Sequence, residues 1–491
     1  MCLKLSKTDL LFLASGLLVF LYIFVKASIS SFTTDESFSY LHYAHTSFMD
    51  IISFSDWYTN NHILNSLLMK YAEVLFGSSE ISLRLPNLLL FAVYMVYGFL
   101  LFKNSDRLVA WAVFILLCTN PGMVDLFGLA RGYGLSYGFL LMSLYHFIRY
   151  FQTRKSKDIV FFHIASMLAV LSSFTMLISY AALMLIYFIT DFINSRIILK
   201  KKYLFFESVK VHIIPVVLIT IILYEPVRRV FMRSELDFGG KDGFYSNTVS
   251  DLIKNLLHGV EISPAWMIVA QIVITVLVLA GSVIILRLFF KKDDRTFFQY
   301  TGLFITNLLI IFISLAILFQ HMILGTDYPI ARFSLFLFPV FIVYFGFLLS
   351  YFGEKNRNLV AISGLCLALL SAGSFLLKAD LRSCSEWRFD METKNMISKL
   401  EEYHEKDFSG KRQAKIGLNW LFEPTVNFYR QTRNIYWLMP ADRKGVSPDD
   451  DYCYLFKDDL NKLNTGSYRI IAEYSNINTV LIENLKSVNQ P

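Results

Sequence analysis

The chain has 491 residues, of which 55% are hydrophobic and 16% aromatic, with a formal net charge of +7 and a mean hydropathy of +0.49. A water-soluble domain of this length cannot bury so much apolar surface, so the composition excludes an ordinary soluble protein and predicts a polytopic membrane protein. The basic residues gather in short loops, which favours anionic lipid headgroups over nucleic acid as their partner.

Long apolar stretches fill most of the chain. A spanning helix needs about 20 apolar residues, and about eleven stretches qualify up to residue 377. We therefore expect an all-α transmembrane domain over residues 1–377, with an outer loop at 28–80.

The remaining residues, 378–491, contain no spanning stretch and mix charged with apolar residues, which predicts a soluble domain tethered by the last helix. Helix-like and strand-like stretches alternate in it, and we expect a small α/β domain. The expected helices are 392–403 and 423–432, and the expected strands are 414–418, 452–456, 468–472 and 479–482.

The basic loops predict the orientation, since short loops rich in Lys and Arg stay in the cytoplasm. Loops such as 149–157 and 196–202 have this character. Consecutive spans cross the membrane in opposite directions, so the loops between the basic ones lie on the other side. We therefore expect the Asp35 loop, the region 125–132, the loop 320–332 and the C-terminal domain together on the outer side of the membrane.

The first outer loop begins with Thr33-Thr34-Asp35-Glu36. This segment matches the capping box S/T-x-x-E, so it predicts a helix start at which Asp35 complements the helix dipole. An ionised aspartate at a membrane interface can also accept a proton from an incoming hydroxyl. Both interpretations can hold at once.

Other features of this loop also have simple structural explanations when each is considered alone. The pair Trp57-Tyr58 is aromatic, and Asn60-Asn61-His62 is typical of a turn followed by a helix cap. The segment Arg84-Leu85-Pro86-Asn87 is typical of an interfacial arginine at a helix entry.

Together, however, these features resemble the GT-C superfamily of integral-membrane glycosyltransferases, which take sugar from a polyprenyl-phosphate carrier. Protein mannosyltransferases and the lipid A aminoarabinose transferase are relatives. The resemblance covers residues 1 to about 150, and the later spans by architecture alone. It lies in Asp35-Glu36, the aromatic-rich loop, Asn61-His62-Ile63-Leu64, and Phe76-Gly77 to Arg84-Leu85-Pro86-Asn87. At Ile63 the chain departs from the family, in which a proline is usual.

The resemblance implies roles for the two acidic residues. Asp35 would be the general base that deprotonates an acceptor hydroxyl or amine as it attacks the anomeric carbon, with inversion of configuration. Glu36, the second expected catalytic residue, would orient Asp35 or the acceptor.

The leaving phosphate requires fixed positive charge near the outer headgroups. For this donor-phosphate site the resemblance favours Arg332, with Arg131, Tyr328 and His62 as further candidates. Arg131 could equally snorkel to lipid phosphates, and Arg332 faces either headgroups or substrate. Asp125 is a possible second acid.

The expected function is therefore an inverting glycosyltransferase, a hexosyl- or pentosyltransferase, that moves sugar from a polyprenyl-phosphate donor to a lipid, glycan or protein acceptor. The expected location is the bacterial inner (plasma) membrane, with the site outside the cytoplasm. The alternatives are a transporter or flippase of lipid-linked sugars, and a non-catalytic membrane scaffold.

No calcium or zinc pattern is present, so we expect no cofactor and no metal site, although a divalent metal is possible. Cys384 and Cys453 fall in the expected outer domain, where an oxidising compartment would permit a disulfide. The C-terminal domain could cover the active-site cavity, grip the acceptor, or be purely structural.

Overall fold

The computed structural model describes nine ranges of the chain, and Trp57 and Tyr58 of the expected aromatic loop lie outside them. The ranges are residues 7–55, 60–198, 202–232, 239–257, 261–290, 300–354, 356–407, 413–463 and 468–485.

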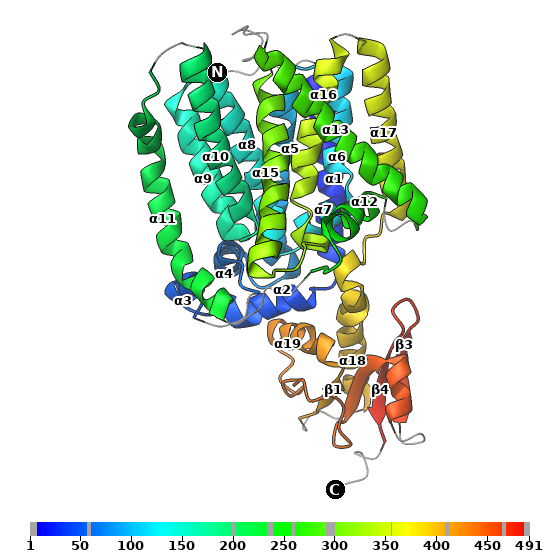
Figure 1. The fold of residues 1–491 in the computed structure, drawn as a ribbon. Coiled ribbons are helices and arrows are strands. Elements are labelled where there is room, and N and C mark those ends of the chain that lie inside the picture. The colour runs from blue at the N-terminus through cyan, green and yellow to red at the C-terminus, as the bar shows by residue number, and fades with distance from the viewer. Residues whose placement is uncertain are drawn as a thin grey trace.

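Long apolar helices form a bundle in which they run side by side (Figure 1). Their apolar side chains meet in one main cluster that joins residues from Phe12 to Phe375. The helices of the bundle are α1 Lys7–Ile29, α5 Glu80–Phe102, α6 Arg107–Cys118, α7 Pro121–Phe127, α8 Gly132–Thr153, α9 Ser156–Ser172, α10 Met176–Ile193, α11 Phe205–Met232, α13 Pro264–Phe290, α15 Thr301–Leu324, α16 Leu337–Gly353 and α17 Arg357–Lys378.

Within the described residues, six helices are long and apolar enough to cross a membrane: α1, α5, α10, α11, α13 and α15. The pair α6 and α7, bent by 63°, would make a seventh, and α16 and residues 362–378 of α17 are shorter apolar helices. The chain is thus an integral membrane protein. The count of eleven spans stays a prediction.

Short helices lie at the end of the bundle that is drawn lowest in Figure 1. They are α2 Thr34–Ser39, which continues into a π-helical turn at Tyr40–Ala44, then α3 Phe48–Ser53 and α4 Ile63–Phe76. The predicted capping box is confirmed: the Thr33 hydroxyl accepts from Glu36 N, and the Glu36 carboxylate accepts from Thr33 N. Asp35 therefore sits in the first turn of α2.

The C-terminal region lies beyond this end of the bundle (Figure 1). Its four-stranded sheet has the order β1-β2-β4-β3, in which β1 and β2 are parallel and the other pairs are antiparallel. The predicted helices and strands are present, with small shifts at their ends. They are α18 Thr393–Asp407, β1 Ile416–Leu418, α19 Glu423–Thr432, β2 Tyr452–Phe456, β3 Tyr468–Tyr474 and β4 Thr479–Asn484. A 3-10 segment that was not predicted, Ser385–Glu392, precedes α18.

One apolar cluster joins this region to the membrane part. Phe32, Tyr40 and Met69 pack in the same cluster as Ile416 and Phe428. The C-terminal region is therefore attached by a shared core as well as by α17, and a division into two separate domains stays a prediction.

The possible disulfide between Cys384 and Cys453 does not form, because both residues are buried free thiols. Cys384 packs in the main cluster of the bundle, whereas Cys453 packs on β2 against Val480 and Ile482. Burial raises the pKa of each thiol to about 12. The sequence left this disulfide open, and the structure excludes it because the two cysteines belong to different cores.

Candidate active site

Glu36 is completely buried and forms a two-pronged ion pair with Arg84. Arg84 Nε lies 2.8 Å from Glu36 Oε1, and Arg84 Nη2 lies 2.7 Å from Oε2. Glu36 also accepts hydrogen bonds from Ala130 N at 2.6 Å and Thr33 N at 2.9 Å. Both carboxylate oxygens thus have partners within the protein, and the role of Glu36 in orienting Asp35 or the acceptor stays a prediction.

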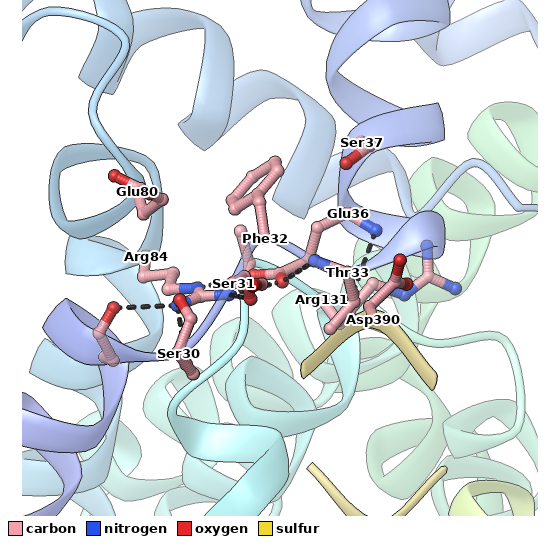
Figure 2. Close-up of polar contacts among 12 residues, drawn as sticks. Ser30, Ser31, Phe32, Thr33, Glu36, Ser37, Glu80, Arg84, Arg131 and Asp390 are labelled. Carbon is pink, nitrogen blue, oxygen red and sulfur yellow. Dashed lines mark hydrogen bonds and ion pairs between the residues drawn. The ribbon is translucent and has the colours of Figure 1, made fainter. Parts of the chain in front are cut away.

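Arg84 fastens the end of α1 to α2. Figure 2 shows its guanidinium beside Ser30 and Ser31 and directed toward Glu36. It donates to the carbonyl oxygens of Ala27 at 2.7 Å and Ser31 at 2.8 Å, besides Ser30. Arg84 therefore holds the backbone that leads into α2 and is not an interfacial residue at a helix entry. Its helix, α5, starts earlier, at Glu80.

Asp35, the neighbour of Glu36, remains partly open to solvent, with its side chain 21% exposed. Its Oδ2 atom lies 3.4 Å from Arg131 Nη2 and 3.6 Å from Arg332 Nη2. The structure therefore brings together three residues that the sequence predicted for one site, from segments far apart in the chain.

Arg131 is buried beneath this carboxylate, which excludes snorkelling to lipid phosphates. It donates to Ser39 Oγ at 2.9 Å and to Asn60 Oδ1 at 2.5 Å. Its guanidinium also lies near the Tyr133 ring, with 5.8 Å to the centroid. Its Nε atom has no hydrogen-bond partner within the described part of the chain. The position of the Arg131 side chain is thus fixed by hydrogen bonds, while its Nε–H group remains available as a donor.

Arg332 is the more accessible arginine, with its side chain 22% exposed. Its backbone N donates to Glu386 Oε1 at 2.9 Å, and its Nη1 atom donates to Glu386 Oε2. Its Nε atom donates to Tyr133 OH at 3.3 Å, and its guanidinium lies over the Trp387 ring. Burial lowers the pKa of Arg332, but the coulombic effects of Tyr133, Glu386 and Asp35 outweigh burial and raise it overall.

The sequence analysis missed Glu386. An acid next to Trp387, a few residues after the last apolar stretch, was the available signal. Its pairing with Arg332 depends on the loop 320–332 and the C-terminal region coming together, which the sequence does not show.

His62 lies close to the site, with its ring 4.8 Å from the Tyr133 ring between centroids. Its Nδ1 atom lies 2.8 Å from the Ser172 carbonyl oxygen, which can only accept, so Nδ1 carries the proton. Burial, then the charges of Arg131 and Arg332, hold the pKa of His62 well below its usual range. The Nδ1 proton is thus directed to the Ser172 carbonyl, and a role of His62 as a phosphate ligand stays a prediction.

Tyr328 has a different role from the one expected. Its backbone pairs with Gly240 in both directions at 2.9 Å, and its ring stacks on His321 with 4.1 Å between centroids. Within the described residues, none of these contacts reaches Asp35 or Arg332. Tyr328 therefore stabilises the loop that carries Arg332. These contacts do not support Tyr328 as a phosphate ligand, and that role stays a prediction.

Asp125 does not face Asp35 as a second acid. Its Oδ1 atom is 2.6 Å from Lys26 Nζ, and its Oδ2 atom accepts from Ser385 N at 3.0 Å and from Ser385 Oγ at 3.2 Å. A carboxylate held in this way joins α1, α7 and the 385–392 segment. These contacts already occupy both oxygens, so they do not support Asp125 as a second acid, and that role stays a prediction.

The arrangement defines what the site can do. One accessible carboxylate can accept a proton, and two guanidinium groups beside it can hold a doubly charged phosphate, since planar N–H donors match phosphate oxygens. Among the residues that the structure describes, no three His, Cys, Asp or Glu side chains gather as a metal site.

The family model described as dolichyl-phosphate-mannose-protein mannosyltransferase matches residues 63–221. This segment includes Arg84 and Arg131 but neither Asp35 nor Arg332. No curated protein matches the chain by sequence.

Two solved structures share the fold over nearly the whole chain. ArnT from Cupriavidus metallidurans in the apo state has a TM-score of 0.54 at 12% identity, with 98% of each chain covered. The same protein bound to undecaprenyl phosphate gives the same TM-score and identity, with 99% of this chain and 100% of that one covered. The predicted resemblance to the GT-C superfamily is thereby confirmed.

Proposed function

We propose that the protein is an inverting glycosyltransferase that moves a sugar from a polyprenyl-phosphate carrier to a lipid, glycan or protein acceptor. The observation that carries the proposal is Asp35, an accessible carboxylate bracketed by Arg131 and Arg332. The fold shared with ArnT, which was solved with undecaprenyl phosphate, supports a carrier of this chemical class.

In this reaction Asp35 accepts the proton of the acceptor hydroxyl or amine. The acceptor atom forms a bond to the anomeric carbon as the bond from that carbon to the phosphate oxygen breaks on the opposite face. Arg332 and Arg131 stabilise the charge that develops on the leaving phosphate. A phosphate on Arg332 would also compete for the guanidinium that now pairs with Asp35, leaving the carboxylate to the acceptor.

We place this reaction on the outer face of the bacterial inner membrane. The support is the distribution of basic loops, together with the position of Asp35, Asp125 and the C-terminal region at one end of the bundle. The donor would then reach the site from the outer leaflet.

Mass spectrometry of cell-envelope glycans and glycolipids tests the function. Three strains are compared: one with the intact chain, one with Asp35→Asn, and one without the chain. A sugar that is missing from both the deletion strain and the Asp35→Asn strain supports transfer and identifies the product. If the deletion alters the glycans and Asp35→Asn does not, the transporter or scaffold alternative replaces this proposal.

A further inference from the structure

Asp390, in the 385–392 segment, touches the start of the helix that carries Asp35. Its Oδ2 atom accepts a hydrogen bond from Thr34 N at 2.6 Å and lies 2.8 Å from Thr34 Oγ1. Thr34 is the first residue of α2 and precedes Asp35 directly. Figure 2 shows Asp390 beside the start of this helix, near Thr33. Asp390 is 1% exposed, so solvent does not replace these contacts.

The residues that lead into α2 are held from the same side. Ser31 Oγ donates to Met391 O and accepts from Lys394 N, both at 3.1 Å. Phe32 N donates to Tyr429 OH at 2.9 Å, and the Phe32 ring stacks on Phe428 with 4.1 Å between centroids. The backbone from Ser31 to Thr34 is therefore fixed by the C-terminal region.

The 385–392 segment also reaches the other side of the site, where Glu386 holds Arg332 through the arginine backbone N and side chain. One short segment thus contacts both the helix of the proposed base and the arginine proposed for the phosphate. A misplacement of about 1 Å in such a site can reduce the rate on the order of 100-fold.

We propose that Asp390 is a positioning residue for Asp35, through its hydrogen bonds to Thr34, and that the C-terminal region is thereby part of the catalytic apparatus. This inference rests on the proposed function, because it assumes that Asp35 is the base.

The surroundings of Asp390 indicate which property of its side chain matters. The hydroxyls of Thr34, Thr393 and Thr425 surround it, and no Lys or Arg among the described residues pairs with it. Burial raises the pKa of Asp390 to about 7, against hydrogen bonds from these threonines that lower it. A neutral side chain of the same shape, as in Asp390→Asn, can still accept from Thr34 N, so the hydrogen bond matters more than the charge.

The test measures kcat and the KM for the polyprenyl-phosphate sugar on the purified full-length chain. The donor is taken from the pool of polyprenyl-phosphate sugars in the native membrane. Asp390→Ala is expected to lower kcat at least 10-fold with a KM change below about 2-fold, while Asp390→Asn keeps at least half of kcat. The matched control is Asp451→Ala, another buried carboxylate of the C-terminal region, which accepts from Lys415 N at 2.8 Å and should keep kcat.

A second pair of variants applies if Asp390→Ala fails to fold. Thr34→Val removes the hydroxyl, which lies 2.8 Å from Asp390 Oδ2 and 2.6 Å from Leu421 O, both in the C-terminal region, and should lower kcat several-fold. Thr34→Ser keeps the hydroxyl and should keep kcat. Equal kcat in Thr34→Val and Thr34→Ser would overturn the inference. Equal kcat in Asp390→Ala and the control Asp451→Ala would also overturn it. The same holds for equal kcat in Asp390→Asn and Asp390→Ala. If Asp35→Asn retains full activity, the proposed function itself fails, which is a separate result.

Discussion

Asp35 and Glu36 are adjacent in the sequence but lie in opposite environments. Successive residues of a helix point about 100° apart, so when one side chain of the pair enters the core the other can face the opening. Glu36 meets Arg84, Ala130 N and Thr33 N in the interior, and Asp35 meets two arginines at the edge of the site. The first carboxylate is structural, and the second is available for chemistry.

Arg332→Ala is expected to weaken binding of polyprenyl phosphate by about 10- to 100-fold, since a hydrogen bond to a charged group contributes about 1.5–3 kcal/mol. Calorimetric titration of the purified chain with polyprenyl phosphate measures the affinity. Arg469→Ala is a suitable control, because Arg469 pairs with Glu483 on the C-terminal sheet. Equal affinities in the two variants would rule out Arg332 as the phosphate ligand.

Asp390 also predicts a pH dependence of stability. Its pKa is about 7 in the folded chain, against an ordinary value of 3.8. Between these values the folded state binds more protons than the unfolded state, so the Asp390 contribution to stability is present at low pH and is lost as the pH rises toward 7. The unfolding temperature of Asp390→Asn, relative to the unaltered chain, should therefore rise from pH 4 to pH 7 and then level off. A constant difference would contradict this expectation.

Some of the site could be predicted from the sequence, because the relevant residues lie in recognisable local patterns. Asp35 follows a span in a capping box, and Arg332 lies a few residues before the apolar helix α16. The sequence did not show the partners of His62 and Asp125: the Nδ1 atom of His62 lies against the Ser172 carbonyl oxygen, and Asp125 pairs with Lys26 and Ser385. Such contacts join distant segments, and a local pattern does not contain them.

At the scale of elements, α2 is too short to hold its own orientation. An isolated helix of six residues is unstable in water, so its position depends on what packs around it. The Glu36–Arg84 pair fixes one side, and Asp390 with Tyr429 fixes the other. The proposed base therefore sits on a helix that is defined by tertiary contacts.

Glu36→Ala should destabilise the protein strongly, by about 3–5 kcal/mol, because it leaves the buried Arg84 guanidinium without its counter-charge. Thermal unfolding in detergent measures the effect, and Glu402→Ala is the control. Glu402 pairs with Lys399 and Lys406 on an exposed face of α18, where loss of an ion pair changes stability little. Similar unfolding temperatures for the two variants would show that the Glu36–Arg84 ion pair does not stabilise the folded protein.

At the scale of the whole molecule, the membrane part and the C-terminal region share a core. The hydrophobic runs predicted the helices, and the stretch Tyr452–Phe456 was predicted with the bounds that β2 has. The shared core was not predicted, because it depends on contacts between distant segments, such as the Phe32 and Phe428 rings, whose centroids lie 4.1 Å apart. Hydrophobic periodicity identifies which face of an element is buried, but it does not identify the partner of that face.

The predicted orientation can be tested by thiol labelling in intact cells, in a background that lacks Cys2 and Cys366. Lys444→Cys, in the C-terminal region, should react with a membrane-impermeant reagent. Lys155→Cys, in the basic loop between α8 and α9, should react only after the cells are permeabilised. Both positions are exposed, so access to the thiol depends on the side of the membrane. The reverse pattern would place Asp35 in the cytoplasm and contradict the outer-face proposal.

The central claim is that Asp35 is the general base of a sugar transfer, and release of polyprenyl phosphate by the purified chain tests it most directly. The reaction contains polyprenyl-phosphate sugar and acceptor extracted from the native envelope. The account predicts that Asp35→Asn releases polyprenyl phosphate at least about 100-fold more slowly than the unaltered chain while it still binds the carrier. Release at an unchanged rate by Asp35→Asn would contradict the account.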